Sequence, residues 1–153
     1  AQNVTNKVIF LATGTARDKE MEKRIEEHKR SRPDRWRTIE EARNISSVLL
    51  DPHPSCELII VDCLTFFVSN LILEGIKEGS ILQEIQAIVN IILQADYTTI
   101  VVSNEVGGGV VPDNELGRRF RDIVGLANQV MAKSAHEVYL VVSGIPVKLK
   151  GDS

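Results

Sequence analysis

Residues 58–62 read Leu-Ile-Ile-Val-Asp, an unbroken apolar run that ends on a carboxylic acid. An apolar run without polar alternation is typical of a strand covered on both faces, as in a parallel sheet. Three further runs of this kind are Val8–Ala12, Thr99–Ser103 and Val138–Val142. We therefore predict four buried strands, with Val147–Leu149 as a short edge strand after the last of them.

Helical patterns separate these runs, at residues 18–30, 38–50, 64–73, 80–94 and 115–135. Thr38 and Glu41 have the spacing of a capping box, which predicts that the second helix begins there. Strands that alternate with helices predict an α/β domain with a mostly parallel sheet and helices on both faces. A chain of 153 residues has the length of one domain, so we expect residues 1–153 to form a single one.

The composition limits the classes of partner. The net charge of −3 argues against a broad basic surface for nucleic acid but leaves room for a local phosphate site. The 2 cysteines are too few for a disulfide scaffold and lack zinc-type spacing, which favours a reducing compartment. No apolar run reaches the ~18 residues of a membrane span, and the first residues have no signal-peptide pattern. We expect a cytoplasmic protein without a membrane span.

Polar or small residues stand at the end of each predicted strand. Thr13-Gly14 follows the first strand, Asp62 ends the second, Asn104-Glu105 follows the third and Ser143-Gly144 follows the last. In open α/β sheets, ligands bind beyond the carboxyl ends of the strands. This convergence predicts a binding site at that edge of the sheet.

Two side chains near this edge have the chemistry of a catalytic site. Asp62 has the position of a strand-end acid that holds Mg²⁺ in phosphate-handling enzymes, although a turn or helix-cap aspartate has the same pattern. His28 continues the apolar stripe of Met21 and Ile25, so we expect it at the border of the buried face. An imidazole there is either a nucleophile or general base, or a packed, hydrogen-bonded histidine.

A basic cluster surrounds His28 in this acidic protein and includes Lys29, Arg30 and Arg32. Cations beside a histidine suit a polyphosphate substrate, because they neutralise a leaving pyrophosphate. The alternative is a solvated helix end, where positive charge interacts favourably with the helix dipole.

Two other features leave several functions open. Residues 107–109 are Gly-Gly-Gly, in a loop that is either a mobile lid, a surface for close backbone approach or simply flexible. They do not form a phosphate-binding P-loop, because the pattern GxxxxGK[ST] is absent from the sequence. Arg118, Arg121 and Asp122 lie together on the last long helix and could meet a substrate phosphate, form a subunit contact or face solvent.

An ordered set of short stretches is more specific than any of these motifs. The set includes Arg24-Ile25-Glu26-Glu27-His28-Lys29, Arg32-Pro33, Trp36-Arg37-Thr38, Asp62-Cys63-Leu64-Thr65, Ser103-Asn104-Glu105-Val106-Gly107, Arg119-Phe120-Arg121-Asp122 and Val141–Lys148. In this order, from about Val8 to Lys150, the chain resembles the bifunctional adenosylcobinamide kinase / adenosylcobinamide-phosphate guanylyltransferase family of cobalamin synthesis.

The resemblance implies a three-layer, RecA-like P-loop NTPase fold and two reactions. In the first, ATP or GTP phosphorylates the aminopropanol hydroxyl of adenosylcobinamide. In the second, a histidine takes GMP from GTP as a phosphoramidate and releases pyrophosphate. Adenosylcobinamide phosphate then accepts the GMP, which gives adenosylcobinamide-GDP. Transfer in two displacements is covalent catalysis.

The resemblance also implies site residues and partners. His28 matches the guanylylated histidine of the family, and Asp62 matches the acid that serves Mg²⁺. The implied GTP-binding residues are Thr13, Gly14, Lys29, Arg30, Ser31, Arg32, Glu40 and Asp62. The expected partners are the corrinoid, GTP and ATP, without nucleic acid. Family members form trimers, so a homotrimer is expected.

One departure from the family pattern concerns the P-loop. The family begins with a strand and a P-loop of the form GGxRSGKS, and the sequence starts after the matching place. A sheet without that strand would leave a gap with exposed apolar flanks. We therefore expect roughly 20–30 residues, a strand–loop–helix start, to precede Ala1. The alternatives are a nucleotide-binding structural or regulatory subunit that has lost its P-loop, and a relative with only one of the two activities.

Overall fold

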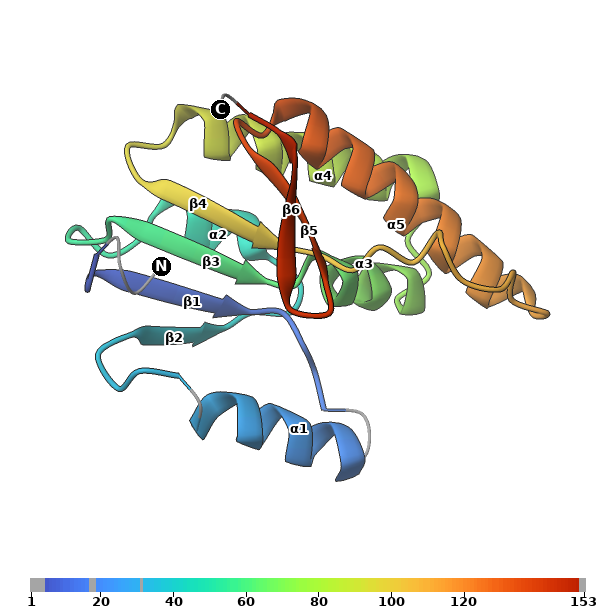
Figure 1. The fold of residues 1–153 in the computed structure, drawn as a ribbon, viewed down its shortest axis with the longest axis horizontal. Coiled ribbons are helices and arrows are strands. Elements are labelled where there is room, and N and C mark those ends of the chain that lie inside the picture. Colours follow the sequence, from blue (N-terminus) through green and yellow to red (C-terminus); the bar gives the residue numbers. More distant parts are fainter. Residues whose placement is uncertain (1–4, 17–18, 31, 152–153) are drawn as a thin grey trace.

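The structure, a computed structural model, describes residues 5–16, 19–30 and 32–151, without the side chains of Met21 and Arg24. Its centre is a parallel sheet in the strand order β2-β1-β3-β4 (Figure 1). The strands are β1 Val8–Ala12, β2 Arg37–Glu40, β3 Leu58–Asp62 and β4 Thr98–Val102. The sequence patterns predicted β1, β3 and β4. They missed β2, which is a short edge strand with largely exposed side chains.

The register of the sheet aligns the strand ends. Ala12 lies opposite Glu40 of β2 on one side and Asp62 of β3 on the other. Asp62 in turn lies opposite Val102 of β4. The carboxyl ends of the four parallel strands therefore form one edge of the sheet, as predicted, and bring Glu40 and Asp62 to either side of β1.

Helices flank the sheet. They are α1 Lys19–Arg30, α2 Ile45–Leu50, α3 Leu64–Leu73, α4 Glu78–Gln94 and α5 Glu115–Ser134. Figure 1 shows α2 to α5 gathered on one side of the strands, while α1 lies beside β2. This α/β arrangement, with a parallel sheet flanked by helices, confirms the predicted fold class and is consistent with a P-loop NTPase-like fold.

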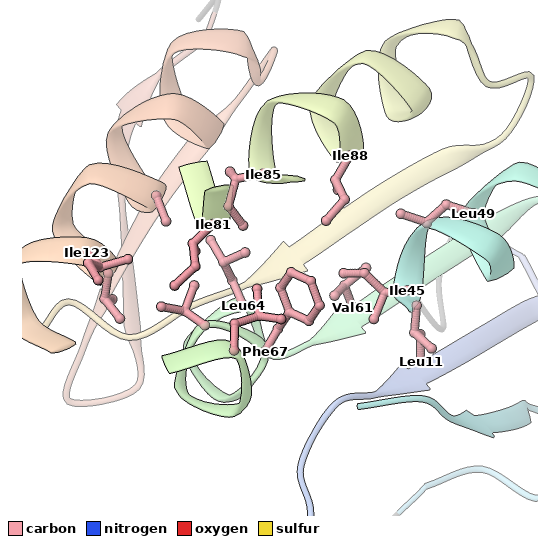
Figure 2. Close-up of a cluster of buried hydrophobic side chains, with 14 of the residues drawn as sticks. Leu11, Ile45, Leu49, Val61, Leu64, Phe67, Ile81, Ile85, Ile88 and Ile123 are labelled. Carbon is pink, nitrogen blue, oxygen red and sulfur yellow. The ribbon is translucent and has the colours of Figure 1, made fainter. Parts of the chain in front are cut away.

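The main core lies between the sheet and helices α2 to α5. Leu11 and Val61 of the strands point toward Phe67 of α3, and Ile85 and Ile123 bring α4 and α5 into the same cluster (Figure 2). Alternate strand residues form a second buried cluster on the opposite face: Val8, Phe10, Leu58 and Ile60, with Ala12 and Trp36 packed against them. Both faces of β1 and β3 are thus covered, which is the reason for their unbroken apolar runs.

The predicted capping box at Thr38 is wrong. Thr38 lies in β2 opposite Phe10, and α2 begins only at Ile45. Glu41 does act near a helix start, because its Oε1 accepts from the amides of Arg43 and Asn44, both at 2.8 Å. Residues 37–40 therefore adopt the strand conformation that pairing with β1 favours, and not the helix start that the capping pattern predicts.

The last two strands form a hairpin of their own. β5 Val138–Val142 pairs antiparallel with β6 Ile145–Lys150. The turn residues Ser143 and Gly144 have φ angles of 53° and 81°, the left-handed conformations that a two-residue hairpin turn requires. β5 and β6 form a separate two-stranded sheet, so the prediction that residues 138–142 belong to the parallel sheet is wrong. Ser143-Gly144 is therefore a hairpin turn and does not end a strand of the parallel sheet.

Apolar side chains remain exposed along β4 and the hairpin. Ile100 and Val102 of β4 are 37% and 40% exposed, and Val141 and Ile145 of the hairpin are 62% and 66% exposed. β4 is also the last strand of the parallel sheet on its side. None of the helices among the described residues is long and apolar enough to cross a membrane.

Candidate active site

Thr13 joins the ends of β1 and β3. Its side chain is fully buried, and its hydroxyl donates to the carbonyl of Cys63 at 2.6 Å and accepts from the Cys63 amide at 2.8 Å. The Thr13 amide donates to the carbonyl of Asp62 at 3.0 Å. Because the hydroxyl uses both its donor and an acceptor position within the fold, Thr13 holds the loop after β1 to the loop after β3.

A buried amide on α3, Asn70, holds the two loops that follow β1 and β2. Its Nδ2 donates to the carbonyl of Thr13 at 2.9 Å and to the carbonyl of Ala42 at 3.1 Å. The hydroxyl of Thr15 lies 3.3 Å from its Oδ1. The sequence analysis gave Asn70 no role. The sequence feature that could have identified it is an amide in the middle of an apolar helix, because a buried polar group requires hydrogen-bond partners.

A cavity of about 390 Å³ opens between α1 and the carboxyl ends of β1 and β2. Three of the predicted nucleotide-binding residues, Gly14, Lys29 and Glu40, lie in its walls. α1 lines it through Glu22, Ile25 and Lys29, whose spacing places them on one face of a helix. The volume is within the range of small-molecule sites, which is roughly 300–1,000 Å³.

An ion pair spans two walls of this cavity. The ammonium of Lys29 lies 2.5 Å from Oε1 of Glu40, and 3.8 Å from Oε1 of Glu26 within α1. The hydrogen bond to Glu40, opposed in part by desolvation, raises the pKa of Lys29. Lys29 therefore keeps its positive charge at neutral pH and places it at the cavity.

Arg32 lies on the second buried cluster. Its guanidinium carbon is 3.8 Å from the centre of the Phe10 ring, a cation–π contact. Burial lowers the pKa of Arg32, while the charges of Asp62 and Glu40 act in the opposite direction. The Nε and Nη1 atoms are buried and have no acceptor among the described residues. Arg32 thus links the ends of β2 and β3 electrostatically and has unused donors for a ligand oxygen.

The histidine of α1 is exposed. His28 precedes Lys29 in the last turn of α1, and its side chain lies outside the walls of the cavity. The prediction that it lies at the border of a buried face is wrong, because α1 presents Ile25 and Lys29 to the cavity. Exposure also removes the alternative of a packed core histidine. Arg30 is exposed as well, and the predicted Ser31 lies outside the described residues.

Asp62 is half-buried at the carboxyl end of β3, and the N-cap position of α3 falls on Cys63. Asp62 is therefore not the N-cap of that helix. Across residues 5–16, 19–30 and 32–151, no group of three or more His, Cys, Asp or Glu side chains could hold a metal ion. A single carboxylate nevertheless fits Mg²⁺ that arrives with a nucleotide, because this ion keeps several waters and binds one or two carboxylates together with phosphate oxygens.

A hydrogen-bonded network occupies the end of β4. Ser103 Oγ lies 2.6 Å from Oδ1 of Asn128 and 3.2 Å from Oγ1 of Thr65. The amide of Asn104 donates to Thr65 Oγ1 at 2.8 Å, and Asn128 Nδ2 donates to the Asn104 carbonyl at 3.0 Å. This network joins the end of β4 to α3 and α5. Sequence reasoning identified Ser103 and Asn104 but not their partners on the two helices.

The family model described as cobinamide kinase / cobinamide phosphate guanyltransferase matches residues 1–149. The chain belongs to this family. The Escherichia coli bifunctional adenosylcobalamin biosynthesis protein CobU is 38% identical, over 95% of this chain and 87% of the relative. The Salmonella typhimurium protein of the same name is 38% identical, over 94% and 86%. The Pseudomonas aeruginosa bifunctional adenosylcobalamin biosynthesis protein CobP is 37% identical, over 95% and 83%.

Membership of the cobinamide kinase / guanyltransferase family confirms the resemblance seen in the sequence. It also confirms the prediction of a bifunctional kinase and guanylyltransferase enzyme of cobalamin synthesis. Within this cobinamide kinase / guanyltransferase, the structure brings together Gly14, Lys29 and Glu40 at the cavity, with Arg32 and Asp62 in electrostatic contact nearby. His28 and Arg30 lie on the exposed side of α1.

Proposed function

We propose that the chain phosphorylates the aminopropanol hydroxyl of adenosylcobinamide and transfers GMP from GTP, through a GMP–histidine intermediate at His28, to adenosylcobinamide phosphate. The observation that carries this proposal is the cavity at the carboxyl ends of β1 and β2, whose walls include Gly14, Lys29 and Glu40. The family description names both activities. ATP and GTP are the proposed phosphoryl donors, and GTP is the source of the GMP.

Two cations suit the site to a triphosphate. Lys29 is in a wall of the cavity, and Arg32 has buried Nε and Nη1 donors that lack an acceptor among residues 5–16, 19–30 and 32–151. Phosphate oxygens are acceptors, so a bound triphosphate would satisfy these donors and offset both charges. A guanidinium also matches the geometry of a phosphate better than an ammonium does. We assign Arg32 and Lys29 to the phosphates of GTP.

The proposed covalent step uses the exposed position of His28. A ring nitrogen attacks the α-phosphorus of GTP, and the N–P bond forms while the bond to the bridging oxygen breaks. Pyrophosphate leaves with that electron pair, and Lys29 beside His28 helps to neutralise it. A phosphate oxygen of adenosylcobinamide phosphate then attacks the same phosphorus and releases the imidazole. An exposed histidine in the last turn of a helix leaves room for both substrates.

Asp62 is the residue that we assign to Mg²⁺. When bound, Mg²⁺ would lower the charge on the phosphates that react and leave. Asp62 lies at the strand end next to β1 and acts electrostatically on Arg32, so its carboxylate belongs to the same region as the phosphate donors.

We also propose that the chain forms a homotrimer. Val110, Val111 and Leu116, between β4 and the first turn of α5, are 95%, 63% and 51% exposed. Neighbouring apolar side chains with this exposure are typical of a surface that another protein covers. Light scattering after size exclusion measures the mass of the assembly. A monomer at all concentrations would contradict this proposal.

The test of the covalent step is the mass of the full chain, as its gene encodes it, after incubation with GTP and Mg²⁺. We expect a gain of one GMP that is lost in acid, as a phosphoramidate is. His28→Ala should take up no GMP. The matched controls are His53→Ala and His136→Ala, which replace the two other histidines, both exposed, and should label like the wild type. Labelling that persists in His28→Ala, or is absent from the wild type, would contradict the proposal.

A further inference from the structure

A groove of about 380 Å³ lies between the loop after β4 and one side of α5. Its lining includes Gly107, Arg121, Asp122, Gly125 and Gln129, and shares no residue with the cavity beside α1. The groove therefore contains two features that the proposed nucleotide site leaves without a function, namely the glycine-rich loop and the charged pair on the last long helix.

Arg121 supplies an unused donor to this groove. Its Nη2 donates to the carbonyl of Gly107 at 2.5 Å, which holds the glycine-rich loop against α5. Its Nη1 is buried and has no acceptor in the described part of the chain. A buried N–H without an acceptor is unfavourable, and a ligand oxygen beside the guanidinium would remove that cost. The flanking glycines allow the loop to adjust around such a ligand.

Gly125 is the residue of α5 that lines the groove without a side chain. It lies in the interior of α5, where glycine is less favourable than alanine. A Cβ at Gly125 would meet nothing within 4 Å, so a side chain placed here would enter the open space of the groove. The core contacts of α5 come instead from Ile123, Val124 and Ala127, which are fully buried. Gly125 is therefore a position where a substitution can block the groove without disturbing the core of α5.

The side chains of the groove favour a neutral polar group. Arg121 offers a donor, Asp122 a carboxylate acceptor and Gln129 an amide that both donates and accepts. A phosphate or an ammonium would meet one favourable and one unfavourable charge, because Arg121 and Asp122 both line the groove. A carboxamide suits both charged groups, because its oxygen accepts from Arg121 and its NH₂ donates to Asp122. Leu126, which also lines the groove, adds apolar contact.

We propose that this groove binds the carboxamide-bearing edge of the corrin ring of cobinamide. The assignment rests on the proposed function, which supplies a corrinoid whose rim carries primary amides. The corrin ring is wider than the groove, so only its edge and side chains enter. The loop of Gly107 follows the carboxyl end of β4, so the groove and the nucleotide cavity lie at the same edge of the sheet.

The experiment measures the binding of cobinamide to the full chain without nucleotide, by equilibrium dialysis followed through the absorbance of the corrin. Gly125→Ala and Gly125→Leu place progressively larger side chains in the groove. We expect Gly125→Leu to raise the Kd for cobinamide about tenfold or more, the effect of losing one hydrogen bond to a charged group, and Gly125→Ala to have a smaller effect. Labelling by GTP, which needs no corrinoid, is measured in parallel and reports an intact fold.

Gly79 provides the matched control. It also lies in a helix, α4, where a Cβ would meet nothing within 4 Å, and it does not line the groove. Gly79→Ala and Gly79→Leu should bind cobinamide with the Kd of the wild type. As a second probe, a corrinoid whose side-chain amides are hydrolysed to carboxylates should bind the wild type at least tenfold more weakly, because Asp122 repels carboxylates.

Three results would overturn this assignment. The first is a wild type that labels with GTP but binds no cobinamide. The second is an unchanged Kd in Gly125→Leu. The third is a change in the mass of the assembly in Gly125→Leu without a change in Kd, which would assign the groove to a contact between subunits. If cobinamide binding weakens in Gly125→Leu while the wild type takes up no GMP, the groove assignment is supported and the covalent step fails alone.

Discussion

The ammonium of Lys29 lies 2.5 Å from Oε1 of Glu40, and this pair ties the last turn of α1 to the carboxyl end of β2. The pair fixes the helix that carries His28 relative to the strand ends. Bound phosphates would compete with Glu40 for the same ammonium. The position of α1 therefore depends on charge as well as on packing, and both can be tested.

Glu40→Gln removes the partner of Lys29 and should show its effect at alkaline pH. The hydrogen bond to Glu40 raises the pKa of Lys29, so the stabilisation is fully present below the unfolded lysine value of ~10.4. It is lost as the pH rises through the higher folded value. The difference in unfolding free energy between wild type and Glu40→Gln, from urea titrations, should be constant from about pH 8 to 10 and shrink above that.

Glu137→Gln is the matched control for this prediction. Glu137 accepts from Lys148 at 3.1 Å and raises the pKa of Lys148 in the same way, but the pair lies at the β5–β6 hairpin. The control should show a similar alkaline profile and leave the affinity for GTP unchanged. A difference for Glu40→Gln that grows above pH 10 would contradict the role of the Lys29–Glu40 pair.

Asp62→Asn tests the magnesium assignment. The carboxylate is half-buried at the end of β3, and its loss should reduce GMP labelling by about 100-fold or more at low Mg²⁺. Raising the Mg²⁺ concentration should restore part of the labelling. Asp96→Asn is the control, because Asp96 is exposed and precedes β4 at the opposite end of the sheet. If labelling by wild type and by Asp62→Asn depends equally on Mg²⁺, Asp62 does not bind the ion and is only a turn residue.

Asn70→Ala tests the amide that holds the loops after β1 and β2, beside the cavity at α1. The substitution leaves the carbonyls of Thr13 and Ala42 without their donor, which should lower the free energy of unfolding by about 2–4 kcal/mol. The KM for GTP should rise as the cavity walls loosen. Asn90→Ala is the control on an exposed face of α4, where Asn90 bonds only to Gln86 among the described contacts. Equal stabilities for the two variants would rule out this structural role.

Tyr97→Phe tests the connection between α2 and the start of β4. The Tyr97 hydroxyl donates to the carbonyl of Leu49 at 2.5 Å, and burial raises the pKa of Tyr97 to about 12. Loss of this bond should cost about 1 kcal/mol at neutral pH. The unfolded tyrosine ionises near pH 10, so the wild type should lose stability above that pH and the difference between wild type and variant should shrink.

Absorbance near the phenolate band follows this titration directly. Tyr139→Phe is the control, since Tyr139 is 50% exposed and bonds to Glu137 at the surface. It should leave the titration near pH 12 in place and cost little stability. Removal of that late titration by Tyr139→Phe would show that Tyr139, and not Tyr97, is the buried phenol.

Burial on both faces made the central strands predictable. β1 and β3 have unbroken apolar runs because Ile9 and Leu11 enter the main core while Val8 and Phe10 enter the second cluster. β2 escaped prediction because it lies at the sheet edge and its side chains are mostly exposed. Its strand conformation comes from pairing with β1, which no local pattern in the sequence contains.

The same distinction applies to the candidate site, where some residues could be placed from the sequence and others could not. Strand-end residues such as Asp62 could be placed from sequence, because the carboxyl ends of parallel strands meet at one edge. The exposed position of His28 could not be placed, since it depends on how α1 lies against β2. Asn70, Asn128 and the open floor at Gly125 also depend on contacts between segments distant in the chain. Local periodicity does not contain those contacts.

Trp36 is the single tryptophan of the chain, so the tryptophan fluorescence of the protein reports on one place in the structure. Its ring stacks on Phe10 with centroids 6.3 Å apart and an interplanar angle of 19°, and the Arg32 guanidinium lies over the same Phe10. A phosphate that draws on Arg32 changes the field around the indole. With GTP bound at Arg32 as proposed, tryptophan emission should follow the binding and release of GTP in real time, without a label on either molecule.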